Sequence, residues 1–387
     1  MRKTQTHSGT LDFMNKQIRY VLLGALVLAI GGGIWKSMSS VPAADGAAAG
    51  DPAPASAAKV ATVKVLTGSA KFAFLKDEQL TAILAAEGLK LELEKSGSTS
   101  ADVARAGTFD AVWPAGANTA SDFSAVLPGS SAYPVFSTPL AVASWKKLVP
   151  VLSANGLVKV VGKHGDLNLE KALPLMVSAK RWNQLSGNDV FSVNRGFLVN
   201  TPDVRKSNTG ALFIATLAYI RNGNEVPTDL AKAGALADEL SPLISRQGFQ
   251  ESTLSGPFED YIGQGMGKAP LVLVYESQFV EAKRQGKLND AHTLLYPQPG
   301  LVLKHILVGR SANGKKLGEI LSNNREAQVI AAQYGFRTTD PAIFEAAAKE
   351  IELDAPELLN LADAPSTPVL DAMNQVLVNK LEGKALQ

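Results

Sequence analysis

Residues 198–210, LVNTPDVRKSNTG, combine residue types that can bind an anion. Apolar residues at its start predict a strand, and a helix is expected to begin near Asn208. The first N–H groups of a helix lack intrahelical acceptors and together carry about half a positive elementary charge. Ser207, Asn208 and Thr209 can cap such a helix or donate to a guest, and Arg205 adds a full charge. The stretch predicts a site for an anion or a carboxylate, although an ordinary cap in a surface loop has the same composition.

Three further strand-to-helix turns carry similar chemistry. They are Leu66–Lys71 (LTGSAK), Lys95–Ser100 (KSGSTS) and Asp110–Ala115 (DAVWPA). The first two couple a glycine with a hydroxyl at a helix start, which makes Ser69 and Ser98 candidate ligand-binding residues. None of the turns has the spacing of a phosphate-binding Walker loop or a dinucleotide-binding loop. Ligands of open α/β sheets bind outside the carboxyl ends of the strands, so we expect the turns to meet at one site.

The pattern of apolar segments predicts an α/β fold that can position these turns. From residue 60 onward, short apolar strands alternate with helical patterns, as in βαβ units whose sheet is covered on both faces. Expected strands cover 60–66, 89–93, 109–113, 197–199, 269–274, 294–296 and 301–308, and expected helices cover 80–86, 98–106, 208–221, 228–247, 315–334 (interrupted near Asn323), 342–361 and 369–381. This part of the chain is too long for one small sheet, so two α/β lobes are favoured.

The N-terminal segment predicts export. A basic segment, 1–19, precedes an uncharged apolar run, Tyr20–Trp35, that can be extended past Lys36 to Met38. We expect 20–38 to be a signal-anchor that spans the inner membrane once, with 1–19 in the cytoplasm and the remainder in the periplasm. A cleaved secretory signal is the alternative. Residues 39–59 are rich in Ala, Pro and Gly and are expected to form a linker.

Composition argues against several classes of chemistry. The chain of 387 residues has no cysteine and four histidines, and its net charge is +2. The histidines lack the spacing of metal ligands, and no nucleophile elbow is present, so neither catalysis nor a metal or other cofactor is expected. There are no runs of Lys and Arg with interleaved aromatic residues, so no nucleic-acid partner is expected.

The order of these motifs resembles that of type II periplasmic solute-binding proteins. Two Gly-Ser turns and DAVWPA are followed by STPLAVA at Ser137–Ala143, by DVRKSNTG at Asp203–Gly210 and by VYESQ at Val274–Gln278. The resemblance covers roughly residues 60–340. It is closest to the oxyanion-type branch and to exported binding domains that some bacteria fuse to von Willebrand A domains. The insert between Lys146 and Asn194 departs from the oxyanion receptors.

The resemblance implies two lobes that close on a solute. Lobe 1 would hold 60–138 plus 297–387 and lobe 2 would hold 139–296, each around a mixed sheet, with crossovers near 137–143 and 296–303. The implied ligand-binding residues are Ser69 and Ser98 in lobe 1, Thr138 at the hinge, Arg205, Ser207, Asn208 and Thr209 in lobe 2, and Tyr275 and Glu276 on the far wall. Glu276 has an alternative role as the structural partner of an arginine on a buried strand end.

Two functions fit these expectations. The first is a membrane-tethered receptor that captures a small anionic or carboxylated solute and delivers it to an inner-membrane transporter. The second is an anchored sensor or scaffold that uses the receptor fold to bind a protein partner. The extension 351–387 bears on the choice, because its apolar residues have helical spacing. They can pack on lobe 1 or form a docking helix for a partner.

Overall fold

The computed structural model describes residues 60–96, 100–205, 207, 209–248 and 256–384. Residues 58–387 form one compact unit. The expected cytoplasmic segment, signal-anchor and linker (1–59) lie outside the described residues, as do Ser98 and Asn208. Within the described ranges, no helix has the length and apolar character needed to cross a membrane.

The described strands form one mixed sheet. They are β1 (Ala61–Thr67), β2 (Leu89–Lys95), β3 (Ala111–Trp113), β4 (Ser131–Trp145), β5 (Val158–Val161), β6 (His164–Asn168), β7 (Val272–Tyr275), β8 (His292–Gln298), β9 (Val302–Gly309) and β10 (Arg337–Thr338). Their order is β2-β1-β3-β9-β4-β8-β6-β5, and β7 and β10 both pair with β4. The α/β fold with a mixed sheet, expected from the sequence, is confirmed.

The long strand β4 joins the two halves of this sheet. Its first part, Ser131–Pro139, pairs antiparallel with β9. Its second part pairs antiparallel with β7 over Leu140–Ala143 and with β8 over Val142–Trp145. The chain returns between the halves through the connection from β8 to β9, where Leu140 N donates to Leu301 O at 2.8 Å. Both segments lie where the sequence placed crossovers, and the lobe boundaries themselves stay a prediction.

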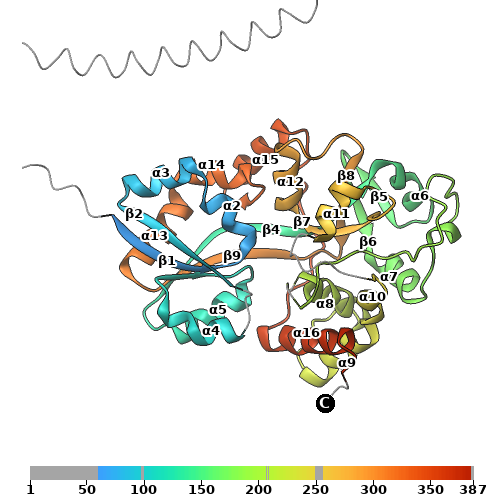
Figure 1. The fold of residues 1–387 in the computed structure, drawn as a ribbon, viewed down its shortest axis with the longest axis horizontal. Coiled ribbons are helices and arrows are strands. Elements are labelled where there is room, and N and C mark those ends of the chain that lie inside the picture. The colour runs from blue at the N-terminus through green and yellow to red at the C-terminus, as the bar shows by residue number, and fades with distance from the viewer. Residues whose placement is uncertain (1–59, 97–99, 206, 208, 249–255, 385–387) are drawn as a thin grey trace, which may run out of the picture. The chain divides into compact units, whose positions relative to one another are not determined.

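The described helices cover both faces of each half of the sheet. They are α2 (Phe72–Leu75), α3 (Glu78–Ala86), α4 (Ser100–Arg105), α5 (Ala117–Val126), α6 (Val149–Ala154), α7 (Leu169–Val177), α8 (Thr209–Arg221), α9 (Leu230–Leu240), α10 (Pro242–Ser245), α11 (Gly256–Gln264), α12 (Glu276–Arg284), α13 (Ala312–Asn323), α14 (Arg325–Gln333), α15 (Pro341–Glu350) and α16 (Thr367–Leu381). In the first half, α3, α13 and α14 cover one face and α4 and α5 cover the other (Figure 1). In the second half, α6 to α10 pack on one face and α11 and α12 on the other.

Helix boundaries follow local capping chemistry. The expected break near Asn323 is confirmed, because α14 starts after Asn324, whose side chain accepts from Ala327 N at 2.9 Å. The expected helix 342–361 is wrong in its second half. It ends at Glu350, and Glu352 has φ of 56°, a left-handed conformation that a helix cannot continue.

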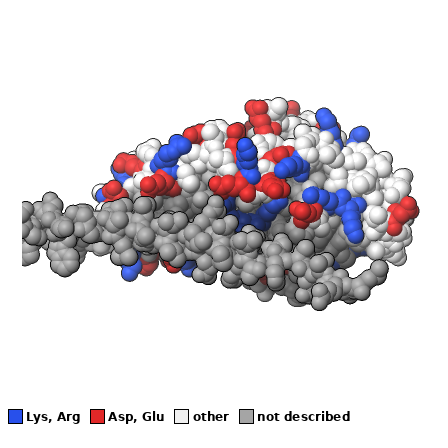
Figure 2. Space-filling model, turned by 90° about the horizontal axis from the view of Figure 1, so that it is seen from above, with Lys and Arg blue, Asp and Glu red and all other residues white. Residues whose placement is uncertain are grey.

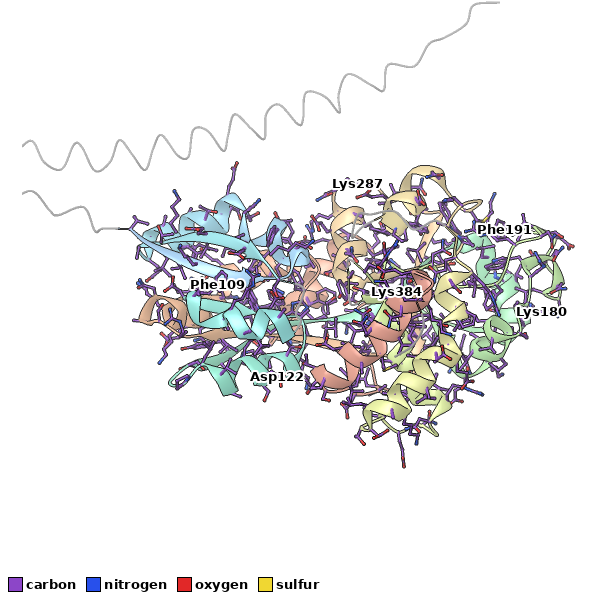
Figure 3. The ribbon with its side chains drawn as sticks, turned by 60° about the horizontal axis from the view of Figure 1, so that its bottom comes forward. Phe109, Asp122, Lys180, Phe191, Lys287 and Lys384 are labelled. Atoms are coloured by element: carbon purple, nitrogen blue, oxygen red, sulfur yellow. The ribbon has the colours of Figure 1, made fainter. Side chains whose placement is uncertain are left out.

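The position of the C-terminal helix corrects one sequence-based expectation. We expected 297–387 in lobe 1, but α16 packs against α8 and α9 in the core of the second half (Figures 1 and 3). Val369, Met373 and Leu377 repeat every four residues and are buried there. The contact involves small residues of α9, because Ala233 and Ala237 belong to the same buried cluster and Gly234 lies next to Val376. The spacing of apolar residues predicts which face of this helix is buried, but it does not predict which half of the fold the helix packs against.

The insert between Lys146 and Asn194 adds to the same core. It contributes α6, β5, β6 and α7, and it buries Trp182 completely. Phe191 and Phe197 meet the Trp182 ring edge to face, with centroids 5.1 and 5.2 Å away. Trp182 is therefore a packing residue.

Charges of both signs are interspersed on the molecular face shown in Figure 2. Several of the ion pairs among the described residues, such as Lys64 with Glu92, join two exposed side chains. Such pairs contribute little to stability, so the buried cores described above carry the fold.

A candidate ligand-binding cleft

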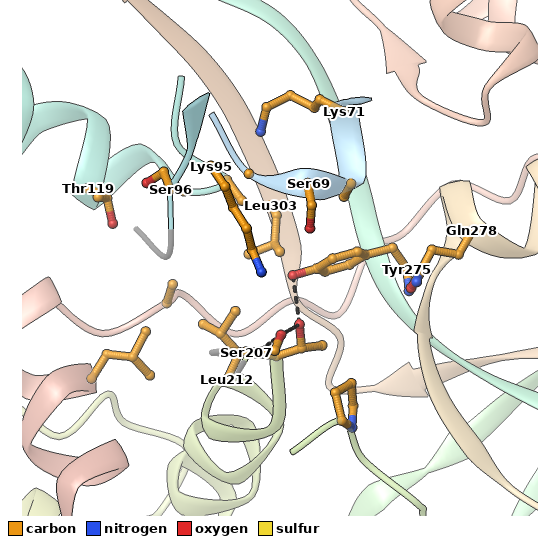
Figure 4. A pocket seen from close by; sticks show the side chains of 18 of the residues that line it. Ser69, Lys71, Lys95, Ser96, Thr119, Ser207, Leu212, Tyr275, Gln278 and Leu303 are labelled. Carbon is orange, nitrogen blue, oxygen red and sulfur yellow. Dashed lines mark hydrogen bonds between the residues drawn. The ribbon is translucent and has the colours of Figure 1, made fainter. Parts of the chain in front are cut away.

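The carboxyl ends of three parallel strands lie in register. Thr67, the last residue of β1, is opposite Lys95 of β2 and Trp113 of β3. The turns that follow these strands therefore meet at one edge of the sheet. A cleft of about 420 Å³ is located there. Figure 4 shows Ser69, Lys95, Ser207 and Tyr275 around the same space.

Seven parts of the chain line the cleft. They are the turn 68–73 after β1, the end of β2, the start of α5, the segment 202–212 with the start of α8, Tyr275 with α12, Leu303 on β9, and the C-terminal stretch 364–370. Of the expected ligand-binding residues, Ser69, Ser207, Thr209 and Tyr275 line it. Their contact with a ligand stays a prediction.

The start of α8 presents a chain of hydroxyl groups. Thr209 Oγ1 lies 2.8 Å from Ser207 Oγ and 3.0 Å from the Tyr275 hydroxyl (Figure 4). Burial raises the pKa of Tyr275, although its hydrogen bond with Thr209 acts in the opposite direction. The tyrosine therefore stays a neutral phenol, and the three hydroxyls can reorient to donate to a guest.

Gly210 lets the preceding loop pack tightly against the start of α8. A Cβ at this position would lie 2.6 Å from Val204 Cγ1 and 3.1 Å from Pro202 O. Since Pro202 itself lines the cleft, the glycine helps to shape the wall around Thr209.

Lys71 lies beneath the turn after β1 and is fully buried. Its Nζ is 3.2 Å from His305 Nδ1 and 5.4 Å from the centre of the Trp113 ring. Burial lowers the pKa of Lys71 to about 7. In the part of the chain that the structure describes, no carboxylate forms an ion pair with it. The sequence analysis did not identify this residue, because one lysine in a turn resembles a surface residue.

His305 on β9 is buried with Lys71. Burial lowers its pKa well below the usual value, and the positive charge of Lys71 adds to the effect. Its Nε2 is buried and has no hydrogen-bond partner among the described residues. The imidazole is therefore neutral and offers Lys71 a dipole rather than a countercharge.

The C-terminal stretch forms a wall that the sequence analysis missed. Asn118 Nδ2, at the start of α5, donates to Ala364 O at 2.8 Å and to Pro365 O at 3.0 Å. Thr119 Oγ1 lies 3.2 Å from Thr367 Oγ1. The stretch thus contacts α5 on one side, while α16 packs on α8 and α9 on the other.

Three expected ligand-binding residues do not line the cleft. The Arg205 guanidinium binds Asp203, with Nη2 2.7 Å from Oδ2 and Nε 2.9 Å from Oδ1. Hydrogen bonds to Asp203 raise the pKa of Arg205, so an acid only two residues away already engages its charge. Thr138 is fully buried in β4, and its hydroxyl accepts from Ser277 N at 3.3 Å, near the start of α12.

Glu276 is the third, and the structure favours its alternative role. Its carboxylate is 1% exposed and accepts from Arg337 Nε at 2.6 Å and from Arg337 Nη2 at 2.7 Å. The Tyr296 hydroxyl donates to it as well. Glu276 is therefore the structural partner of an arginine on β10, and it neither contacts Arg205 nor faces the cleft.

No metal-binding cluster is evident. Across the described ranges, no group of three or more His, Asp or Glu side chains could hold a metal ion. The chemistry of the cleft is instead that of hydroxyls, amides, Lys71 and Lys95, with a single acid, Glu281 on α12, along its lining.

Comparison with solved structures identifies the fold. Apo ferric ion-binding protein A from Pasteurella haemolytica matches with a TM-score of 0.52 and 13% identity, over 84% of this chain and 99% of that protein. An ABC transporter solute-binding protein from Thermotoga lettingae, bound with α-D-tagatose, matches with a TM-score of 0.51 and 10% identity, over 84% of this chain and 95% of that protein. The chain has the fold of solute-binding proteins.

The comparisons show the fold, but they show neither the expected oxyanion branch nor the expected relation to domains found with von Willebrand A domains. The periplasmic molybdate-binding protein of Azotobacter vinelandii matches with a TM-score of only 0.41 and 16% identity, over 71% of this chain and 98% of that protein. That likeness is too low to assign an oxyanion branch, and the expected relation to domains found with von Willebrand A domains is not shown. No protein-family model and no curated protein matches the chain.

Proposed function

We propose that the protein is a membrane-tethered, extracytoplasmic solute-binding protein that captures a small anionic or carboxylated solute for an ABC transporter. The fold supports this proposal, since the solved proteins that share it are binding proteins for solutes or ions. It also supports a binding role rather than an enzymatic one. The apolar segment 20–38 would tether the body to the inner membrane, with 60–387 in the periplasm.

One observation carries the choice of an anionic solute. Hydroxyls of Ser69, Ser207 and Tyr275 converge on a cleft whose floor contains the buried amine of Lys71. Hydroxyl donors together with a cation suit a negatively charged guest, and a site with few acids does not repel it.

Binding would work by closure of the two halves of the sheet. The two connections between the halves, β4 near Pro139 and the segment from β8 to β9, would act as hinges. The cleft is lined from both halves, so a guest that contacts both favours the closed state.

Thermal unfolding of the full-length protein in detergent tests this function. The panel is sulfate, molybdate, phosphate, acetate, succinate, hexanoate and glutamate, with glucose as a neutral control. An anion present at about 100 times its dissociation constant adds about 2.7 kcal/mol of stability and raises the midpoint by a few degrees. A shift with anions alone supports the proposal, whereas no shift with any anion contradicts it.

An anchored sensor or scaffold is the second candidate. The C-terminal stretch favours it, because residues 364–367 occupy one wall of the cleft and bind α5. A built-in wall reduces the space for a solute. If the panel produces no shift in a folded protein, crosslinking in membranes then tests for a protein partner.

A further inference from the structure

Lys71 is a buried cation without a buried anion. Its side chain is 0% exposed, and its one hydrogen-bond partner in the described structure is the neutral ring of His305, at 3.2 Å. Burial of an unpaired ammonium group costs several kcal/mol even after local relaxation. A protein would avoid that cost with an apolar residue unless the charge has a use.

The charged and titratable groups around the amine do not neutralise it. His305 faces it from β9, and the Trp113 ring faces it from β3. Lys95 on β2 and Glu281 on α12 line the same cleft, but Lys95 is exposed and Glu281 accepts from Gln285 at 3.0 Å. Tyr275 is engaged with Thr209. None of these groups supplies Lys71 with a countercharge.

Gly68 connects the amine to the cleft. A Cβ at this position would lie 3.7 Å from Lys71 Nζ, and Gly68 itself lines the cleft. Since glycine has no side chain, only the thin backbone of the turn stands next to the amine. The positive charge of Lys71 would therefore attract an anionic guest in the cleft across the backbone of this turn.

We propose that Lys71 recognises the acid group of a small organic acid, whose apolar body lies against Leu212, Leu303 and Leu370. This inference rests on the proposed solute-binding function and narrows its ligand class. Volume is the first argument. A cleft of about 420 Å³ is within the range of about 300–1,000 Å³ typical for organic ligands, whereas a water molecule occupies only about 30 Å³. A bare inorganic oxyanion would leave most of it empty.

The lining is the second argument. Leu212 and Leu303 belong to one buried apolar cluster, against which Leu370 packs, and all three line the cleft. Apolar walls stabilise the hydrocarbon body of a ligand but add no binding energy for a small oxyanion. One buried amine on one side and apolar walls on the other match a ligand with one acid group.

Binding would be linked to proton uptake. Without ligand, the pKa of Lys71 is about 7 because of its burial. An anion close to Nζ favours the ammonium form, so above pH 7 binding takes a proton from solvent. The affinity then falls by about tenfold for each pH unit above 7, until the pKa of the bound state is reached.

Titration calorimetry with the full-length protein in detergent tests this inference. The probes are hexanoate and its neutral analogue hexanamide, at pH 6, 7, 8 and 9. We expect wild type to bind hexanoate with the pH dependence given above and to bind hexanamide weakly. Lys71→Met should weaken hexanoate by about tenfold or more and abolish the pH dependence above 7. Lys90→Met, which removes an exposed lysine of β2 outside the cleft, should keep both the affinity and the pH dependence of wild type.

The outcomes separate this inference from the proposed function. If Lys71→Met binds hexanoate with wild-type affinity and pH dependence, Lys71 does not recognise the acid, although the solute-binding function stands. Binding of sulfate or molybdate but not hexanoate overturns the ligand class. If no anion binds at any pH, the proposed solute-binding function itself is contradicted, and the inference about Lys71 falls with it. A thermal melt of Lys71→Met verifies its folding, and Lys71→Gln serves as a second variant if Met does not fold.

Discussion

The carboxylate of Glu276 and the guanidinium of Arg337 form a bidentate ion pair that ties the start of α12 to β10. The two hydrogen bonds are 2.6 and 2.7 Å long, and Glu276 is 1% exposed. Burial alone would lower the pKa of Arg337, but its hydrogen bonds to Glu276 raise it. The pair joins parts of the chain 61 residues apart and lies outside the cleft.

Loss of one partner should therefore affect stability and not binding. Arg337→Met leaves the Glu276 carboxylate buried and unpaired, which should cost about 3 kcal/mol in the free energy of unfolding. Denaturant unfolding measures it, and the double variant Glu276→Met with Arg337→Met should recover part of the loss. A loss of anion affinity in a stably folded Arg337→Met protein would show that Glu276 acts in the cleft after all.

The burial of Lys71 predicts a pH-dependent stability. The pKa of Lys71 is about 7 in the folded protein, because of its burial, and 10.5 for a free lysine side chain. Between these values the unfolded chain binds more protons, so wild-type stability should rise with pH. From pH 7 to 9 the gain is on the order of 2 kcal/mol relative to Lys71→Met, which lacks the group. Chemical denaturation of both proteins measures this difference.

Lys90→Met is the control for that series. It removes an exposed lysine and should leave the pH dependence of wild type unchanged. A difference between wild type and Lys71→Met that stays constant from pH 7 to 9 would mean that Lys71 is charged throughout, and the account of its burial would be wrong.

Asn118 should hold the C-terminal wall in place. Its amide donates to Ala364 O and Pro365 O, so Asn118→Ala should speed hydrogen exchange in the peptide 362–368. Its cost in overall stability should be about 1–2 kcal/mol. Asn155→Ala is a matched control, because Asn155 also donates to two carbonyls, at 2.8 and 3.0 Å, outside the cleft. Equal exchange of peptide 362–368 in both variants would contradict the proposed role of Asn118.

Thr209 should matter for binding and Thr216 should not. Both are 5% exposed and lie on α8, but Thr209 contacts Tyr275 and Ser207 at the cleft, whereas Thr216 donates to Leu212 O within the helix. Each change to Val should cost about 1 kcal/mol of stability. Only Thr209→Val should weaken anion binding, by about fivefold to tenfold. Similar affinities of the two variants would remove Thr209 from the site.

Local chemistry made part of this site predictable from the sequence. A glycine or hydroxyl cluster between an expected apolar strand and a helix identified Ser69, Ser207 and Thr209, and all three line the cleft. The strand expected at 197–199 is wrong, because these buried residues are not paired in the sheet. The α/β class followed from alternating apolar patterns. These features depend on neighbours in the chain, which is why the sequence reveals them.

Features that depend on distant partners were not predictable. Arg205 is a separate case: it was expected to face a ligand, but its side chain binds Asp203, only two residues away. Glu276 forms an ion pair with Arg337, and Lys71 forms a hydrogen bond with His305. Both partners lie far away in the sequence. Apolar spacing predicted the buried face of α16 but not its packing on α9, which lies far away in the sequence.

A crystal structure of the protein with the tightest-binding anion of the panel tests the central claim most directly. The account predicts density for the ligand between Ser69 and Thr209, with its acid group toward the turn that covers Lys71 and with closer approach of the two halves of the sheet than without ligand. Ligand density at another site, with the cleft between Ser69 and Thr209 free, would contradict the account.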